Sequence, residues 1–259
     1  MSSAYRRDTL YLSPHLDDAV FSCGGQIFAQ AEAGRRVAVL TVAGGDPPPG
    51  DPSPLVRDLH RRWGLADGAV EARREEDRAA CRLLGAECEQ WPVPDALYCR
   101  DPDTGLPLYP SLAALFRGLH PRDCVLIAEL ADRLRALPRA ARVHAPLAAG
   151  RHVDHLLVRG AAEAAFGADL AYYEDFPYSR NRWVLRKALG FGRRWRSEVV
   201  ALGAEALAAK CRAIACYRSQ LPTAFADLED LRRQVGRAAA RAGGERLWRR
   251  RLAAPAPGR

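Results

Sequence analysis

The segment SPHLDD (residues 13–18) places one imidazole and two adjacent carboxylates directly after a short apolar run. Neighbouring carboxylates repel each other, and leaving both unpaired at such a site is costly unless a cation is present. A divalent metal would resolve this conflict, with one of Asp17 and Asp18 as a ligand and the other on the open side of the metal. The alternative is that one aspartate only caps the helix that follows.

A second cluster, RHVDH (residues 151–155), contains two histidines three residues apart, which share a face on a helical turn. Taken alone, His152 and His155 could simply begin a surface helix, with Asp154 satisfying one ring. Together with the first cluster they offer two histidines and one carboxylate. This facial set suits Zn²⁺ or Fe²⁺ and leaves positions for water and substrate. The two clusters therefore predict a metalloenzyme.

Both segments resemble the motifs of a known family, the PIG-L or LmbE-like de-N-acetylases. The first family motif is Pro-His-Pro-Asp-Asp followed by Gly-Gly, and the chain has SPHLDDAVFSCGG, with Leu16 in place of the usual proline. The second motif, His-x-Asp-His, is present as GRHVDH. Similar segments extend from Thr9 to about Trp248. The resemblance implies a zinc-dependent amidohydrolase that acts on molecules containing N-acetylglucosamine.

The resemblance also implies roles for individual residues. His15, Asp18 and His155 would bind the metal, Asp17 would be the general base, and His152 would face the reacting carbonyl. Zn²⁺ is the implied cofactor, with Fe²⁺ as the alternative.

Three further residues complete the predicted site. Asp154 would orient His152 or keep it protonated. Arg73 matches an arginine that helps to hold the substrate in related enzymes, and Asp95 matches a loop aspartate that binds sugar hydroxyls. Without the resemblance, Arg73 and Glu76 would be an ordinary surface pair, and Asp95, between Pro94 and Ala96, would be a turn residue.

Regular elements must bring these distant segments together. Apolar runs at Thr9–Leu12 and Val37–Val42 predict buried strands, and Val20–Ala33 between them predicts a helix. This order indicates a βαβ unit and a parallel sheet, whose carboxyl ends are where ligands bind. Proline-rich segments at 46–54 and 92–110 predict long loops that would shape the active site.

The alternation of strands and helices continues along the chain. Helices are predicted at Ala69–Leu84, Arg122–Leu137, Leu156–Phe166 and Glu205–Gln220, and strands at Arg142–Pro146, Leu170–Tyr173 and Glu198–Leu202. We therefore expect an α/β, Rossmann-like fold with a mostly parallel sheet flanked by helices. Residues 1–252 would form a single deacetylase domain, and 253–259 a flexible tail.

The net charge of +8 is concentrated at one end of the chain. From Arg232 onward there are nine arginines and one acid, which leaves 30 basic and 30 acidic residues before it. A balanced body argues against a nucleic-acid partner. The seven cysteines form no Cys-x-x-Cys pair, and the polar N-terminus resembles no signal peptide. We expect a cytoplasmic bacterial protein with reduced thiols and no stable membrane insertion.

The sequence thus predicts a metal-dependent hydrolase that removes the acetyl group from a small substrate containing N-acetylglucosamine: a glycoconjugate, a thiol precursor or a secondary metabolite. The alternative is a metal-dependent amidase or esterase that acts on a longer acyl chain or a non-sugar scaffold. A binding module driven by the C-terminal arginines would leave both histidine clusters unexplained. A homo-oligomer is compatible with the sequence.

Overall fold

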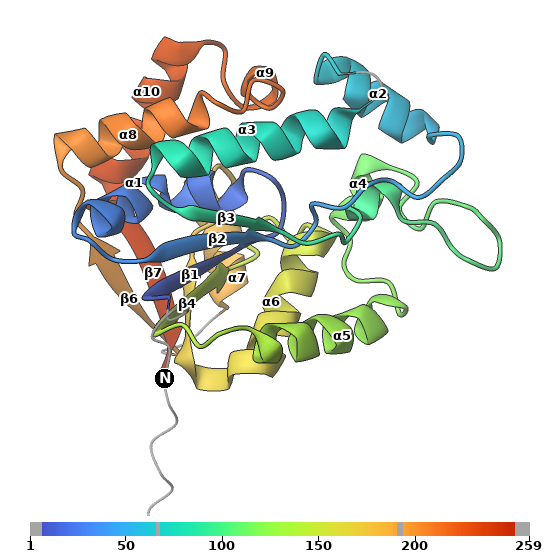
Figure 1. Cartoon of the computed structure of the whole chain (residues 1–259), viewed down its shortest axis with the longest axis horizontal. Coiled ribbons are helices and arrows are strands. Elements are labelled where there is room, and N and C mark those ends of the chain that lie inside the picture. Colours follow the sequence, from blue (N-terminus) through green and yellow to red (C-terminus); the bar gives the residue numbers. More distant parts are fainter. Residues whose placement is uncertain (1–6, 66–67, 191–193, 252–259) are drawn as a thin grey trace, which may run out of the picture.

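Seven strands form one sheet in the order β3-β2-β1-β4-β5-β7-β6 in the computed structural model, which describes residues 7–65, 68–190 and 194–251 (Figure 1). The bounds are β1 (Thr9–Ser13), β2 (Val37–Thr41), β3 (Glu87–Gln90), β4 (Arg142–Pro146), β5 (Leu170–Tyr173), β6 (Trp195–Val200) and β7 (Glu245–Arg250). The first five strands pair in parallel, and β7 pairs antiparallel with both β5 and β6. The expected mostly parallel α/β sheet is confirmed.

The order of connection changes direction at β1. From β1 the chain passes to β2 and β3 on one side, then returns to lay β4 and β5 on the other side. Thr9 is in register with both Val37 of β2 and Arg142 of β4. The carboxyl ends of β1 and β4 therefore flank a topological switch point, where open α/β sheets bind their ligands.

Helices cover both faces of the sheet (Figure 1). On one face α1, α3 and α8 pack on apolar side chains that include Tyr11 and Val39, and on the other α5 and α6 pack on Leu12 and Leu40. The helices are α1 (Asp18–Glu32), α2 (Pro54–Arg62), α3 (Ala69–Leu83), α4 (Leu112–Leu115), α5 (Asp123–Ala136), α6 (Val153–Phe166), α7 (Arg182–Leu189), α8 (Ala204–Ile214), α9 (Leu221–Ala224) and α10 (Leu228–Ala242). Three short 3₁₀ turns are η1 (Ala96–Tyr98), η2 (Gly167–Asp169) and η3 (Tyr178–Arg180).

One predicted helix ends early. The helix expected over Glu205–Gln220 stops at Ile214, because the next residues make tertiary contacts that a continued helix would break. The Tyr217 hydroxyl donates to Asp77 Oδ1 at 2.8 Å, and the Ser219 hydroxyl donates to Glu76 at 2.6 Å. The elements α2, β3, α7, α10 and β7 were not predicted as such. The expected tail at 253–259 lies outside the described residues.

The last strand holds the first helix in place through a buried carboxylate. Glu245 of β7 accepts hydrogen bonds from the backbone N–H groups of Gly25 (3.0 Å) and Gln26 (2.9 Å) in α1. Lys210 of α8 lies 2.7 Å from Glu245 and also donates to the Ser22 carbonyl. Removing one partner of a buried ion pair costs about 3–5 kcal/mol, because the other charge is left buried and unpaired. Lys210 and Glu245 therefore have to be present together for α1 to keep this contact.

No helix within the described ranges is long and apolar enough to cross a membrane. The seven cysteines are all free thiols.

Candidate active site

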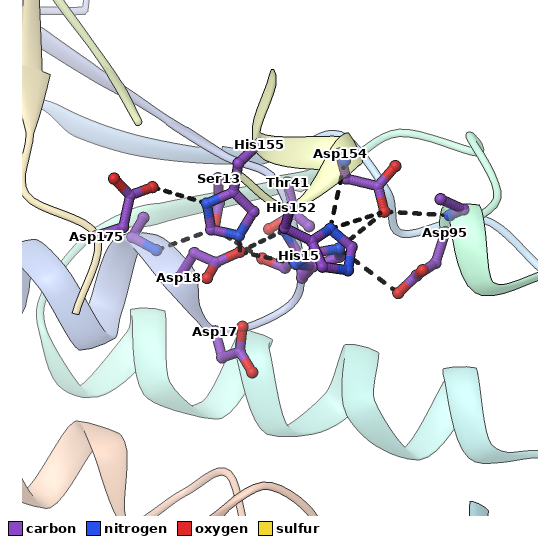
Figure 2. Close-up of polar contacts among 12 residues, drawn as sticks. Ser13, His15, Asp17, Asp18, Thr41, Asp95, His152, Asp154, His155 and Asp175 are labelled. Atoms are coloured by element: carbon purple, nitrogen blue, oxygen red, sulfur yellow. Dashed lines mark hydrogen bonds and ion pairs between the residues drawn. The ribbon is translucent and has the colours of Figure 1, made fainter. Parts of the chain in front are cut away.

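The two histidine clusters meet at the carboxyl ends of β1 and β4 (Figure 2). His15 follows β1, and His152 and His155 lie at the start of α6, which follows β4. The His15 ring centroid lies 4.8 Å from that of His152 and 5.3 Å from that of His155. All three side chains are largely buried, so the alternative of a surface helix start at residues 152–155 is wrong.

In the turn between β1 and α1, neither aspartate side chain is used to cap the helix. The Ser13 hydroxyl accepts the N–H of Ala19 at 3.0 Å and thereby caps α1. Asp17 occupies the N-cap position, but its side chain makes no capping hydrogen bond. Asp18 turns back to accept the N–H of His15 at 2.9 Å. Because the Ser13 hydroxyl caps α1, helix capping does not explain why two carboxylates lie at this position.

One set of side chains has the arrangement of a metal centre. Asp18 Oδ2 lies 3.0 Å from His15 Nδ1 and 3.3 Å from His155 Nε2. The three donors lie within 4.8 Å of one another. His155 Nε2 is buried, and apart from this ion-pair contact with Asp18 it has no partner within the part of the chain that the structure describes. Two imidazoles and one carboxylate suit a divalent transition metal, so these residues fit the metal that the sequence predicts.

The far nitrogen of each histidine contacts a second carboxylate. His155 Nδ1 lies 2.7 Å from Asp175 Oδ1, and His15 Nε2 lies 2.9 Å from Asp154 Oδ2. Such contacts fix the tautomer and the orientation of metal-binding histidines. His15, His152 and Asp154 form a second candidate set, but Asp154 Oδ2 is already engaged by His15 and by the backbone N–H of Ala96 (3.1 Å).

Asp175 was missed by sequence reasoning. It lies two residues after the end of β5, and its other oxygen accepts the N–H of Ala149 at 2.9 Å. The signal that could have found it is its position, because the carboxyl end of β5 lies at the same edge of the sheet as those of β1 and β4.

The electrostatics of the cluster differ from one carboxylate to the next. Burial alone would raise the pKa of Asp18, but His155 and His15 hold it well below its usual range. Burial, together with the charge of Asp18, raises the pKa of Asp17 to about 6 against the opposing effect of Arg73. Burial lowers the pKa of His155, but Asp18 and Asp175 outweigh it and raise that pKa to about 10. Asp18 is therefore the more strongly ionised of the adjacent pair.

Asp17 points away from this cluster and toward α3, where Arg73 lies (Figure 2). The nearest guanidinium nitrogen of Arg73 is 3.5 Å from Asp17 Oδ2, and the guanidinium lies over the Trp63 ring at 4.9 Å. Arg73 is buried, and its Nε has no hydrogen-bond partner among the residues described. The alternative of a surface pair with Glu76 is wrong, since Glu76 accepts two hydrogen bonds from Ser219.

His152 is placed differently from the other two histidines. Its Nδ1 accepts the backbone N–H of Asp154 at 3.3 Å, which leaves Nε2 as the N–H donor. The Asp154 carboxylate is 3.8 Å from His152 Nδ1, so its closer contact is with His15. Burial and the neighbouring His15 lower the pKa of His152 to about 3. His152 is accordingly a neutral imidazole.

The outer wall of the site comes from two loops. Asp95 accepts the N–H of Leu97 at 2.8 Å, as the turn interpretation predicted, while its other oxygen lies 3.7 Å from His15 Nε2. The Phe116 ring packs edge-on against His152 at 5.1 Å and lies 6.1 Å from the Tyr178 ring. Sequence reasoning missed Phe116 because nothing in its local pattern distinguishes it from other loop apolar residues.

This architecture defines a class: an α/β protein with a candidate metal centre at the switch point of its sheet. The family described as PIG-L: GlcNAc-PI de-N-acetylase matches residues 10–166. The chain belongs to this family.

Relatives and solved structures agree with this assignment. The chain is 36% identical over 184 residues to a 2′-N-acetylparomamine deacetylase from Streptomyces fradiae, covering 68% of this chain and 60% of that protein. It is 30% identical over 189 residues to the protein of the same name from Niallia circulans, covering 67% and 68%. The zinc-inhibited form of teicoplanin deacetylase superposes with a TM-score of 0.80 at 28% identity, over 95% of this chain and 99% of that one.

Proposed function

We propose that the protein is a metal-dependent N-deacetylase that hydrolyses the acetamide of an N-acetylglucosamine-type unit in a small glycoconjugate or secondary metabolite. The observation that carries the proposal is the set of His15, Asp18 and His155, next to Asp17, whose side chain makes no helix-capping hydrogen bond. The names of the relatives support the reaction class. The proposed setting is the cytoplasm, with no nucleic-acid partner and no stable membrane insertion. A homo-oligomer is compatible with this proposal.

We assign His15 Nδ1, His155 Nε2 and the Asp18 carboxylate as the ligands of Zn²⁺, with Fe²⁺ as the alternative metal. When bound, the metal supplies Lewis acidity toward a water molecule and the amide carbonyl. Asp154 and Asp175 hold the two imidazoles in the orientation and tautomer that ligation requires.

Asp17 is the proposed general base. Its carboxylate takes a proton from the attacking water, and its raised pKa makes it a better proton acceptor than an ordinary aspartate. His152 donates its Nε2–H to the oxyanion that forms on the former carbonyl oxygen, and as a neutral imidazole it does so without giving up its proton. Asp17 then returns the proton to the leaving nitrogen, which yields acetate and a free amine.

Arg73 and Asp95 are the proposed substrate contacts. Arg73 offers a buried guanidinium beside Asp17, and its Nε, which has no partner among the described residues, can donate to a hydroxyl or carbonyl oxygen of the sugar. Asp95 faces the site from the opposite loop with the oxygen that does not cap η1. Together they would bracket the sugar ring between α3 and the 92–110 loop.

A longer acyl chain is the second candidate substrate, because apolar side chains are exposed beside the site. Phe116, which contacts His152, is 36% exposed, and Leu112 and Leu119 on either side of it in the sequence are 42% and 37% exposed. These residues could bind an acyl group larger than acetyl.

The deciding experiment removes metal from the protein with a chelator, adds back Zn²⁺ or Fe²⁺, and measures the release of free amine. The substrates are a panel of N-acetylglucosaminides, each paired with its N-octanoyl analogue. We expect turnover of the acetyl compounds that disappears on chelation and returns with one of the metals. Activity indifferent to chelation would overturn the metal mechanism, and preference for the octanoyl series would establish the second candidate.

A further inference from the structure

A large hollow lies at the end of the sheet opposite the proposed active site. It has a volume of about 1100 Å³ and is bordered by Leu10 of β1, the segment from Leu134 to Val143, and the C-terminal end of β7. Leu10 lies near the start of β1, whereas His15 lies two residues beyond its end, so about three strand residues, or roughly 10 Å of strand, separate the hollow from the turn that carries His15. The hollow is therefore a separate site and does not extend the first one.

Arginine dominates its lining. Among the described residues that line the hollow, seven are arginines and one, Asp169, carries a carboxylate. Arg139, Arg142 and Arg196 are exposed and form no ion pair with any residue that the structure describes. We call this feature, with its seven arginines, the arginine hollow.

The remaining arginines are only partly neutralised. Arg249 lies 3.7 Å from Glu198, Arg250 lies 2.7 Å from Glu163, and Arg135 pairs with Asp132. The C-terminal ends of α5 and α6 also border the hollow, and each contributes about half a negative charge. With Asp169 included, these groups leave an excess of about two positive charges.

Two of these arginines also act on a buried histidine of the sheet. His144 of β4 is buried against Tyr11, and neither of its ring nitrogens has a hydrogen-bond partner among the described residues. Burial, together with Arg249 and Arg142, lowers the pKa of His144 to about 3. Arg142 and Arg249 are therefore close enough to act on His144, although burial has the larger effect on its pKa.

We propose that the arginine hollow binds a compact soluble anion that carries two or more phosphate groups. Guanidinium groups match phosphate oxygens with paired hydrogen bonds, and several of them converging on one concavity favour a multiply charged ligand. A concave site of this volume admits a small polyanion, whereas the flat surface of a bilayer would reach only its rim. The charge that the sequence concentrates after Arg232 thus contributes to a binding site that also uses Arg139, Arg142 and Arg196.

The test is calorimetric titration of the full chain with inorganic tripolyphosphate. We expect saturable binding that weakens as salt rises above about 150 mM, because exposed charges are screened. The triple variant Arg139→Ala, Arg142→Ala, Arg196→Ala should bind about tenfold more weakly or worse. The matched control removes three exposed arginines elsewhere, with Arg218→Ala, Arg232→Ala and Arg237→Ala, and should bind as the unmodified protein does.

Equal loss of affinity in both triple variants would show a nonspecific charge effect and overturn the proposal, as would the absence of saturable binding. A second arm distinguishes the source of the phosphate by sedimentation with phosphatidylglycerol vesicles. Vesicle binding without tripolyphosphate binding would assign the surface to a membrane and contradict a compact ligand. Unfolding curves of the two variants exclude misfolding as the cause of any loss.

Discussion

The two ends of the parallel sheet present opposite chemistry on the same strands. At the carboxyl end, histidines and aspartates are buried and pair with one another; His155 and Asp175 are each 1% exposed. At the amino end, arginines such as Arg139, Arg142 and Arg196 are exposed, and several have no acidic partner among the residues described. One end resembles an enzyme site, and the other resembles an anion-binding surface.

This difference in burial and pairing predicts how strongly a substitution at each end of the sheet should affect the protein. Buried, paired charges are poorly screened, and breaking one pair leaves an unsatisfied group in a low-dielectric site. Exposed arginines interact weakly, and salt screens them. Substitutions at the carboxyl end should therefore have large effects on chemistry, whereas those at the amino end should affect only binding of an anion.

The largest expected effect follows His155→Ala, which removes a proposed metal ligand. Turnover should fall by about ten-thousandfold or more, because Lewis-acid stabilisation is lost. Metal content of the purified variant should fall with it, as measured by elemental analysis. His120→Ala, in the loop after α4, is the control and should keep both. A variant at His155 that retains full metal content would remove this residue from the ligand set.

The variant Asp17→Asn tests whether Asp17 acts as the general base and not as a metal ligand. We expect metal content to be unchanged and turnover to fall by about a thousandfold, because only proton transfer is lost. Asp18→Asn should lose metal as well, which makes the two adjacent aspartates a matched pair. Identical metal loss in both variants would mean that Asp17 is a ligand too.

Asp175→Asn tests a positioning residue whose carboxylate contacts His155 and the backbone N–H of Ala149. Metal affinity should weaken by about 10–100-fold, and excess metal should restore most of the turnover. A purely structural role would instead lower the midpoint of thermal unfolding with no rescue by metal, so both quantities should be measured on the same preparation.

Arg73→Gln should act mainly on substrate binding. We expect KM to rise by about tenfold with a smaller change in kcat, because a charged hydrogen-bond donor to the sugar is lost. Steady-state kinetics with one N-acetylglucosaminide measures both constants. If kcat falls while KM is unchanged, Arg73 acts through Asp17 and not on the substrate.

The smallest effect is expected at the amino end of the sheet. The variant with alanine at Arg139, Arg142 and Arg196 should turn over an uncharged substrate within about twofold of the unmodified protein, since exposed charges this far away are largely screened. A larger loss of turnover would show that the arginine hollow affects catalysis, and the two ends of the sheet would then not be independent.

The strands that position the site could be predicted from the sequence because both of their faces are buried. Short runs rich in apolar residues predicted β1, β2, β4 and β5 to within one residue at each end. In contrast, β3 (Glu87–Gln90) reads ECEQ and has two glutamates in four residues. Its strand conformation depends on pairing with β2, which local pattern does not reveal.

The sequence predicted the site residues that lie within the two motifs but not those that reach the site from other parts of the fold. Residues within the two motifs could be found because each motif is short and contiguous. Asp175 and Phe116 act through contacts across the fold, with His155 and His152 respectively. Asp154 was expected beside His152, yet its shorter contact is with His15, a pairing 139 residues apart that only the sheet topology creates.

The contact of Glu245 with α1 sets a lower limit on how far the chain can be shortened. The family match ends at residue 166, and a protein cut there would still contain every proposed metal ligand. It would lack Asp175, which contacts His155, and Glu245, which holds Gly25 and Gln26 in the helix that begins at Asp18. The segment that identifies the family is therefore smaller than the unit that can hold the site together.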